Sequence, residues 1–65
     1  MTRKDYILIA AALERSKPLP IANPKMDAVR RSVFEMAARN IADALAQDNP
    51  RFDRERFLKA CGVAS

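Results

Sequence analysis

The sequence predicts an all-α protein in which two helices form a hairpin and a short third helix follows, as one small domain over residues 1–65. Three observations support this fold class. Apolar residues recur at helical spacing in three segments. Each segment starts at a residue type that caps helix N-termini, namely Thr2, Asn23 and Asp53. Each ends before a residue that interrupts or closes a helix, namely Pro18, Pro50 and Gly62.

The first helix is expected over about residues 3–16. Thr2 and Asp5 have the spacing of a capping box, in which the hydroxyl and the carboxylate each accept a backbone N–H bond. Residues 7–9 would also suit a strand, but the alanines at 10–12 have the highest helix propensity. A helix places four residues on one apolar face: Tyr6, Ile9, Ala10 and Leu13.

The second helix is expected over about residues 24–47, after a loop over 17–23 that contains two prolines. Asn23 can accept an N–H bond at the helix start, and Pro24 lacks the N–H that would go unmet there. The helix would be a rod of roughly 35 Å. Charges of alternating sign stand four residues apart and predict an ion-pair ladder on the face toward water: Asp27, Arg31, Glu35, Arg39 and Asp43.

Apolar residues occupy the side opposite this ladder, and we expect that side to face the core: Met26, Val29, Val33, Met36, Ala37 and Ala44. Phe34, Ile41 and Leu45 extend the apolar surface at its edge. Arg30 and Asn40 project toward the same side. Two interpretations of this pair are equally good. They fix register or pair across an interface, or they lie at the edge with the Arg30 head in water.

The third helix is expected over about residues 54–61. Asp53 is its N-cap, and the rings of Phe52 and Phe57 have the spacing of a hydrophobic staple. Gly62 can adopt the left-handed conformation that closes a helix.

A chain of 65 residues buries only about 60% of the surface that it exposes when unfolded, so its stability alone is expected to be marginal. It has one cysteine, Cys61, and no histidine, which excludes an internal disulfide and a zinc site of cysteine and histidine. Self-association or an unusually well-packed core remains as the source of additional stability, and self-association is favoured.

Every residue from 6 to 13 is apolar or aromatic, so one neighbouring helix cannot cover this segment. The sequence therefore predicts a homodimer, with these residues at its interface: Tyr6, Ile7, Ile9, Ala10 and Leu13. The alternative is that the alanines are good helix formers on an ordinary surface.

No residue pattern indicates an enzyme, and no metal, cofactor or small-molecule substrate is expected. Asp27, Glu35 and Asp43 are better explained as partners of arginines at helical spacing than as an acid and base pair. Cys61 lies near a helix C-terminus without a histidine to activate it, and is expected to pack as a small apolar group. The sequence predicts a non-catalytic protein.

The formal net charge is +4, and four basic residues gather near the C-terminal end: Arg51, Arg54, Arg56 and Lys59. This cluster is the candidate surface for a protein partner or for nucleic acid. Asp53 and Glu55 dilute it, and the interval from 47 to 53 is longer than the turn of a helix-turn-helix motif. An ordinary solvated face is therefore favoured over nucleic-acid binding.

Two end segments resemble small proteins encoded by bacteriophages and prophages. They are the opening Met-Thr-Arg-Lys-Asp-Tyr with residues 9–13, and the closing residues 48–63, which are the more specific. The resemblance implies a phage or mobile-element origin and action in the cytoplasm of a bacterial host, and by analogy a host protein as the partner. It transfers no catalytic or binding residue. A signal-peptide pattern and a run of roughly 20 apolar residues are both lacking, in agreement with that location.

Overall fold

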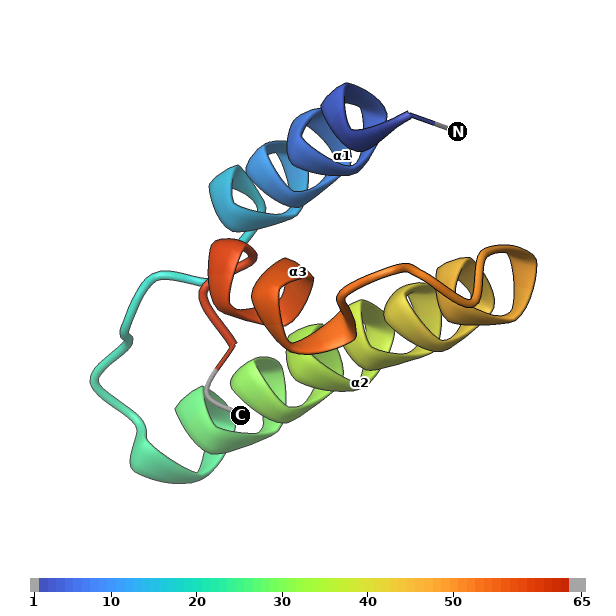
Figure 1. Cartoon of the computed structure of the whole chain (residues 1–65). Coiled ribbons are helices and arrows are strands. Elements are labelled where there is room, and N and C mark those ends of the chain that lie inside the picture. The colour runs from blue at the N-terminus through green and yellow to red at the C-terminus, as the bar shows by residue number, and fades with distance from the viewer. Residues whose placement is uncertain (1, 64–65) are drawn as a thin grey trace.

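The chain forms three helices in a computed structural model, which describes residues 2–63 (Figure 1). They are α1 (Arg3–Arg15), α2 (Pro24–Asp48) and α3 (Arg54–Ala60), and these described residues form no strand. The predicted all-helical class is confirmed. Each helix begins at the predicted residue and ends within one residue of the predicted end.

The side chains that precede the helices satisfy backbone N–H groups that have no partner within the helix. In the capping box of α1, Asp5 N donates to Thr2 Oγ1 at 3.4 Å and Thr2 N donates to Asp5 Oδ2 at 3.0 Å. Asn23 Oδ1 accepts from two N–H groups at the start of α2, at 3.1 and 3.2 Å. Asp53 Oδ1 accepts from Arg56 N at 3.0 Å. All three predicted caps are confirmed.

The end of α3 has the geometry of a Schellman motif. Val63 N donates to Leu58 O at 2.9 Å, and Gly62 N donates to Lys59 O at 3.1 Å. Gly62 has φ +84°, the left-handed conformation expected from the sequence. Lys17 Nζ, in the loop after α1, donates to Gly62 O at 2.9 Å and so ties this loop to the end of α3.

α3 lies between α1 and α2 in space, although it comes last in the chain (Figure 1). Each long helix makes its main contacts with α3, so the two arms of the predicted hairpin are separated by the third helix and contact each other only marginally. One polar contact joins the arms, because Asn49 Nδ2 at the end of α2 donates to the Tyr6 hydroxyl of α1 at 3.2 Å. The short helix is therefore the centre of the fold.

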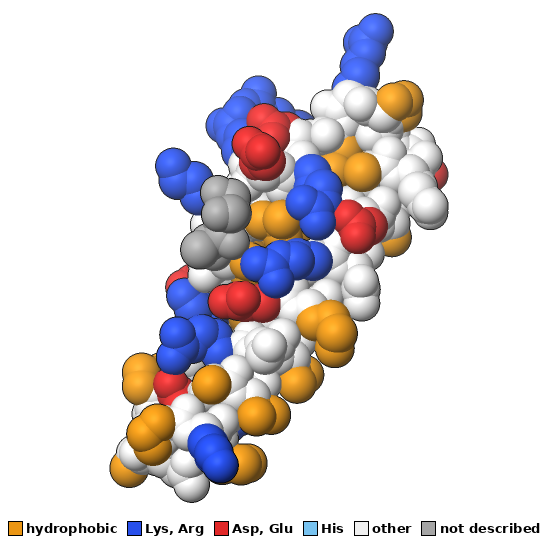
Figure 2. Space-filling view, turned by 90° about the horizontal axis from the view of Figure 1, so that it is seen from below, with side chains coloured by type: hydrophobic (Ala, Val, Ile, Leu, Met, Phe, Trp, Pro, Cys, Tyr) orange, Lys and Arg blue, Asp and Glu red, His pale blue; other side chains and the backbone are white. Residues whose placement is uncertain are grey.

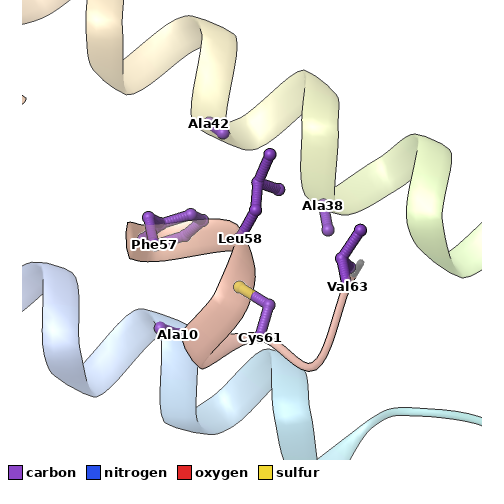
Figure 3. Close-up of a cluster of buried hydrophobic side chains, with 7 residues drawn as sticks. All are labelled: Ala10, Ala38, Ala42, Phe57, Leu58, Cys61 and Val63. Atoms are coloured by element: carbon purple, nitrogen blue, oxygen red, sulfur yellow. The ribbon is translucent and has the colours of Figure 1, made fainter. Parts of the chain in front are cut away.

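The core consists of seven buried apolar side chains that α3 brings together: Ala10, Ala38, Ala42, Phe57, Leu58, Cys61 and Val63. Figure 3 shows Leu58 directed from α3 toward α2, between Ala38 and Ala42. Around this cluster the rings of Phe52 and Phe57 lie 5.4 Å apart, as the predicted staple requires. Alanines on both long helices allow α3 to approach closely, because a methyl group leaves room for the larger side chains opposite.

The predicted core face of α2 is wrong. Six residues that were expected to face the core are exposed: Met26, Val29, Val33, Met36, Ala37 and Ala44. The face that packs on α3 instead contains the buried Ala38 and Ala42, with Phe34, Ile41 and Leu45 half-buried beside them. At 3.6 residues per turn the two faces point roughly 140° apart around the helix. Hydrophobic periodicity offers both faces, and the position of α3 decides which one is buried.

Candidate interaction surface

Four large apolar side chains form an exposed row along α2, which we call the outer row: Met26, Val29, Val33 and Met36. Their exposed fractions lie between 51% and 58%. Figure 2 shows a file of hydrophobic side chains along the molecule on this face. The spacing of three, four and three residues corresponds to the a and d positions of two heptads. A second helix could therefore pack along this row.

The outer row borders a shallow groove whose other lining residues are polar or charged: Ser32, Arg39, Asn40, Asp43 and Arg54. Asn40 is exposed and occupies the a position that follows Val33. At this end Arg54 Nε of α3 donates to Asp43 Oδ1 at 2.7 Å. This ion pair joins α3 to α2 beside the groove and leaves the apolar row open.

Arg30 has a local role that the sequence did not indicate. Its Nη1 donates to Leu19 O at 3.2 Å, and Ile21 N donates to Asp27 Oδ1 at 3.2 Å. These bonds hold the loop between α1 and α2 against the first turns of α2. Both Leu19 and Ile21 expose their side chains, at 77% and 41%, so the loop adds apolar surface close to the N-terminal end of α2.

The predicted ion-pair ladder is present in part along α2. Arg31 Nη2 lies 2.7 Å from Asp27 Oδ2, whereas Arg39 Nη2 and Glu35 Oε1 are 3.7 Å apart. Asp43 pairs with α3 and not with Arg39. The hydrogen bond from Arg31, with a further one from Ile21 N, holds the pKa of the Asp27 carboxyl below its ordinary value. These exposed pairs contribute little to stability individually.

The proposed dimer residues of α1 have different positions. Ala10 is 1% exposed and belongs to the core of its own chain, while Tyr6, Ile9 and Leu13 are half-buried against that core. Ile7 is 60% exposed. Next to it Leu8, which lies outside the proposed set, is 58% exposed. The apolar surface of α1 that is free for a second chain is therefore smaller than the sequence predicted.

A small niche of about 90 Å³ lies between α1 and α3. Tyr6, Phe52 and Phe57 line it, and the rings of Tyr6 and Phe52 meet edge to face with centroids 4.7 Å apart. Arg3 and Arg56 also line it. Ligand pockets for small molecules usually have volumes of about 300 to 1,000 Å³, so this niche has room for one side chain of a partner and little more.

The predicted basic cluster is divided by the fold. Arg51, Arg56 and Lys59 are exposed, but Arg54 is turned toward α2 and paired with Asp43. Arg56 instead lines the niche beside α1. The guanidinium groups of α3 thus serve two sides of the helix and do not converge on one phosphate-sized site.

Cys61 and the acidic side chains are the residue types on which catalysis or metal binding by this chain would depend. Cys61 is fully buried, and burial raises the pKa of its thiol, which keeps it protonated and unreactive. Over residues 2–63, no three side chains of His, Cys, Asp or Glu come together as a metal site would require. Over the same residues, no helix has both the length and the apolar character needed to cross a membrane.

The outer row is the feature that sequence reasoning assigned to the wrong place. Its heptad spacing and the polar Asn40 that continues it were visible, but they were interpreted as a core face. Comparison with protein-family models, curated proteins and solved structures gives no match to this chain.

Proposed function

We propose that this chain is a non-catalytic protein that acts by binding another protein, with the outer row of α2 as its main contact surface. The observation that carries the proposal is the row itself. Four large apolar side chains in line on one helix are more than half exposed, while two alanines of the same helix are completely buried. A contiguous apolar stripe of this kind marks interaction sites on soluble proteins.

The extent of exposed surface supports this proposal. The chain exposes 4983 Å², and its dimensions of 39 × 18 × 14 Å are those of an elongated body. A folded monomer of 7.3 kDa exposes roughly 4,200 Å² on average. The elongated shape accounts for the difference, on the order of 800 Å², and leaves more surface available to a partner than a compact body of this mass has.

The setting of this interaction is proposed from the sequence resemblance. Similarity of the two end segments to phage and prophage proteins favours a protein of a bacterial host as the partner, in the host cytoplasm. A homodimer that covers Ile7 and Leu8 of α1 is compatible with this, because these side chains lie on a different helix from the outer row. Covering both surfaces would offset the marginal stability expected of so short a chain.

Nucleic-acid binding is the second candidate function. The exposed Arg51, Arg56 and Lys59, together with the net charge of +4, favour it. Against it, Arg54 is engaged by Asp43 and the remaining cations are spread over the surface. Binding of this kind would be electrostatic and would weaken steeply with salt.

A matched pair of variants separates the two functions. Val33→Asp places a charge in the outer row, and Ala28→Asp places the same charge at an exposed position of α2 outside the row. The chain and both variants, each tagged, are used to capture proteins from bacterial lysate. We expect the original chain and Ala28→Asp each to capture one protein in an amount equimolar with the tagged chain. Val33→Asp should not capture this protein.

Two results would contradict the proposal. One is a set of captured proteins that is the same for both variants. The other is tight filter binding of duplex DNA at low salt that falls with added salt and is unaffected by Val33→Asp, which would establish the nucleic-acid alternative.

A further inference from the structure

We infer that the outer row receives one amphipathic α-helix of a different protein, and that this helix carries acidic residues on both sides of its apolar stripe. The inference rests on the proposed function and makes it more specific. It names the secondary structure and the charge of the segment that is bound.

The form of the surface favours a helix. Met26, Val29, Val33 and Met36 follow a repeat of 3.5 residues, and this repeat keeps a straight seam against a second helix that crosses at a small angle. Ser32 and Ala37 flank the row, and their small side chains permit close approach of another backbone. Asn40 continues the seam as a polar a position, the type of residue that fixes the register of paired helices.

The charge of the margins favours an acidic partner. In this heptad frame the flanking e and g positions within α2 are Lys25, Arg30, Ser32, Ala37, Arg39 and Ala44. Each charged residue among them is basic. Asp27 and Glu35 lie at the b and c positions, outside these margins. Asp43 occupies the d position that follows Met36 and is paired with Arg54 of α3. Glutamates at the flanking positions of a bound helix would therefore meet cations on both sides of the seam.

The same margins argue against a second copy of this chain on the outer row. A parallel pair in register would place Lys25 of one copy opposite Arg30 of the other. The antiparallel pair that best matches the apolar residues aligns Met26 with Met36, and it would place Lys25 opposite Arg39. Both arrangements bring like charges together at the edge of the interface, which is a standard means of excluding a wrong partner.

The test uses two synthetic helical peptides of three heptads with leucine at a and d. One peptide has glutamate at all e and g positions and the other has lysine; the repulsion between their own flanking charges keeps each from pairing with itself. Binding to the full chain is measured by fluorescence anisotropy. We expect the glutamate peptide to bind at least about tenfold more tightly than the lysine peptide, with affinity that falls as salt is added.

Variants localise the binding to the outer row. Val33→Asp should weaken the glutamate peptide about tenfold or more, whereas Ala28→Asp should leave it within about twofold. The double variant Lys25→Glu with Arg30→Glu should shift the preference toward the lysine peptide. Circular dichroism of each variant establishes that the helices are intact, so a loss of binding is not a loss of the fold.

The outcomes separate this inference from the proposed function. Equal or tighter binding of the lysine peptide, still sensitive to Val33→Asp, would overturn the acidic partner and leave protein binding by the outer row in place. Failure of both peptides would overturn the inference. If sedimentation velocity then shows a dimer that Val33→Asp dissociates, the row belongs to a second copy. If it shows a monomer, capture from lysate decides the proposed function independently.

Discussion

On α2, the face toward α3 is built on two alanines, Ala38 and Ala42, whereas the outer row consists of two methionines and two valines. The alanines are 0% exposed, and every residue of the outer row is more than half exposed. Transfer of side chains from water would favour the reverse arrangement, since a methionine or valine loses far more apolar surface on burial than an alanine. The size of the side chains at a buried position of α2 is therefore determined by the side chains that pack against it.

What lies opposite the alanines is α3, a helix of seven residues that brings Phe57, Leu58 and, just after it, Cys61 into the centre. Bulk on the short helix and methyl groups on the long one give a filled contact, because large and small side chains alternate across it. The outer row has bulk and nothing opposite from its own chain. Phe34, Ile41 and Leu45 of α2 are half-buried against the core, whereas the methionines and valines of the outer row are available for contacts that the isolated chain does not make.

The largest expected effect comes from a substitution in the buried contact between α2 and α3. Leu58→Ala should lower the free energy of unfolding by about 3 kcal/mol, because it empties a site enclosed by α2 and α3. Val33→Ala truncates an apolar side chain of the outer row and should change the free energy of unfolding by less than about 0.5 kcal/mol. Urea denaturation followed by circular dichroism measures both. Equal losses would mean that the outer row is buried in the free protein.

A substitution of a small side chain by a large one tests the same difference between the buried and the exposed face of α2. Ala42→Leu adds three carbons where α3 leaves no space, and should cost about 2 kcal/mol through overpacking. Ala44→Leu makes the same change at an exposed position two residues later and should be nearly neutral in the monomer. Thermal unfolding of the two variants at one protein concentration gives the comparison. A neutral Ala42→Leu would show that α3 does not pack tightly on α2.

A change at the end of α3 has a smaller expected effect. Gly62→Ala puts a Cβ on a residue with φ +84°, within 3.2 Å of Lys17 Nζ, and should cost about 1 kcal/mol. Gly62→Asn should cost less, since asparagine tolerates the left-handed conformation better than alanine. Chemical denaturation of both variants tests the order. If alanine were the better tolerated, the Schellman motif would not determine where Val63 enters the core.

The helices were predictable from local chemistry, because a cap or a breaker acts within a few residues of itself. Thr2 with Asp5, Asn23 with Pro24, and Asp53 set the helix starts that the structure contains. The order of packing was not predictable in this way. That α3 lies between the long helices depends on contacts between residues far apart in the chain, such as the bond from Lys17 to Gly62.

The candidate surface could be predicted only in part from the sequence, for the same reason. Periodicity identified one apolar side of α2 with Phe34, Ile41 and Leu45 at its edge, but it contains no information about which of these residues α3 covers. The reach of arginine side chains adds a second uncertainty. Asp43 pairs with Arg54 of α3, whereas the sequence pattern suggested Arg39, four residues away on α2, as its partner. Local spacing therefore predicted the elements, and the site required their arrangement in space.

The smallest expected effect concerns an exposed ionic contact beside the outer row, in contrast to the buried contacts above. The pKa of Asp27 is lowered in the folded chain by its bonds to Arg31 and to the Ile21 N–H, so the folded state binds fewer protons than the unfolded state near pH 4. This contribution to stability is complete above the unfolded pKa, given by the ordinary value of 3.8, and is lost as the pH falls through the lowered folded pKa.

Asp27→Asn removes this titration and keeps the shape of the side chain. The original chain should therefore be slightly more stable than Asp27→Asn at neutral pH, and the difference should shrink as the solution is acidified below about pH 4. High salt should reduce it as well, since the contact with Arg31 is exposed to solvent. Urea titrations of both proteins across this pH range measure the difference. A difference that grows on acidification would show that Asp27 is stabilised in its protonated form, contrary to the geometry of its two bonds.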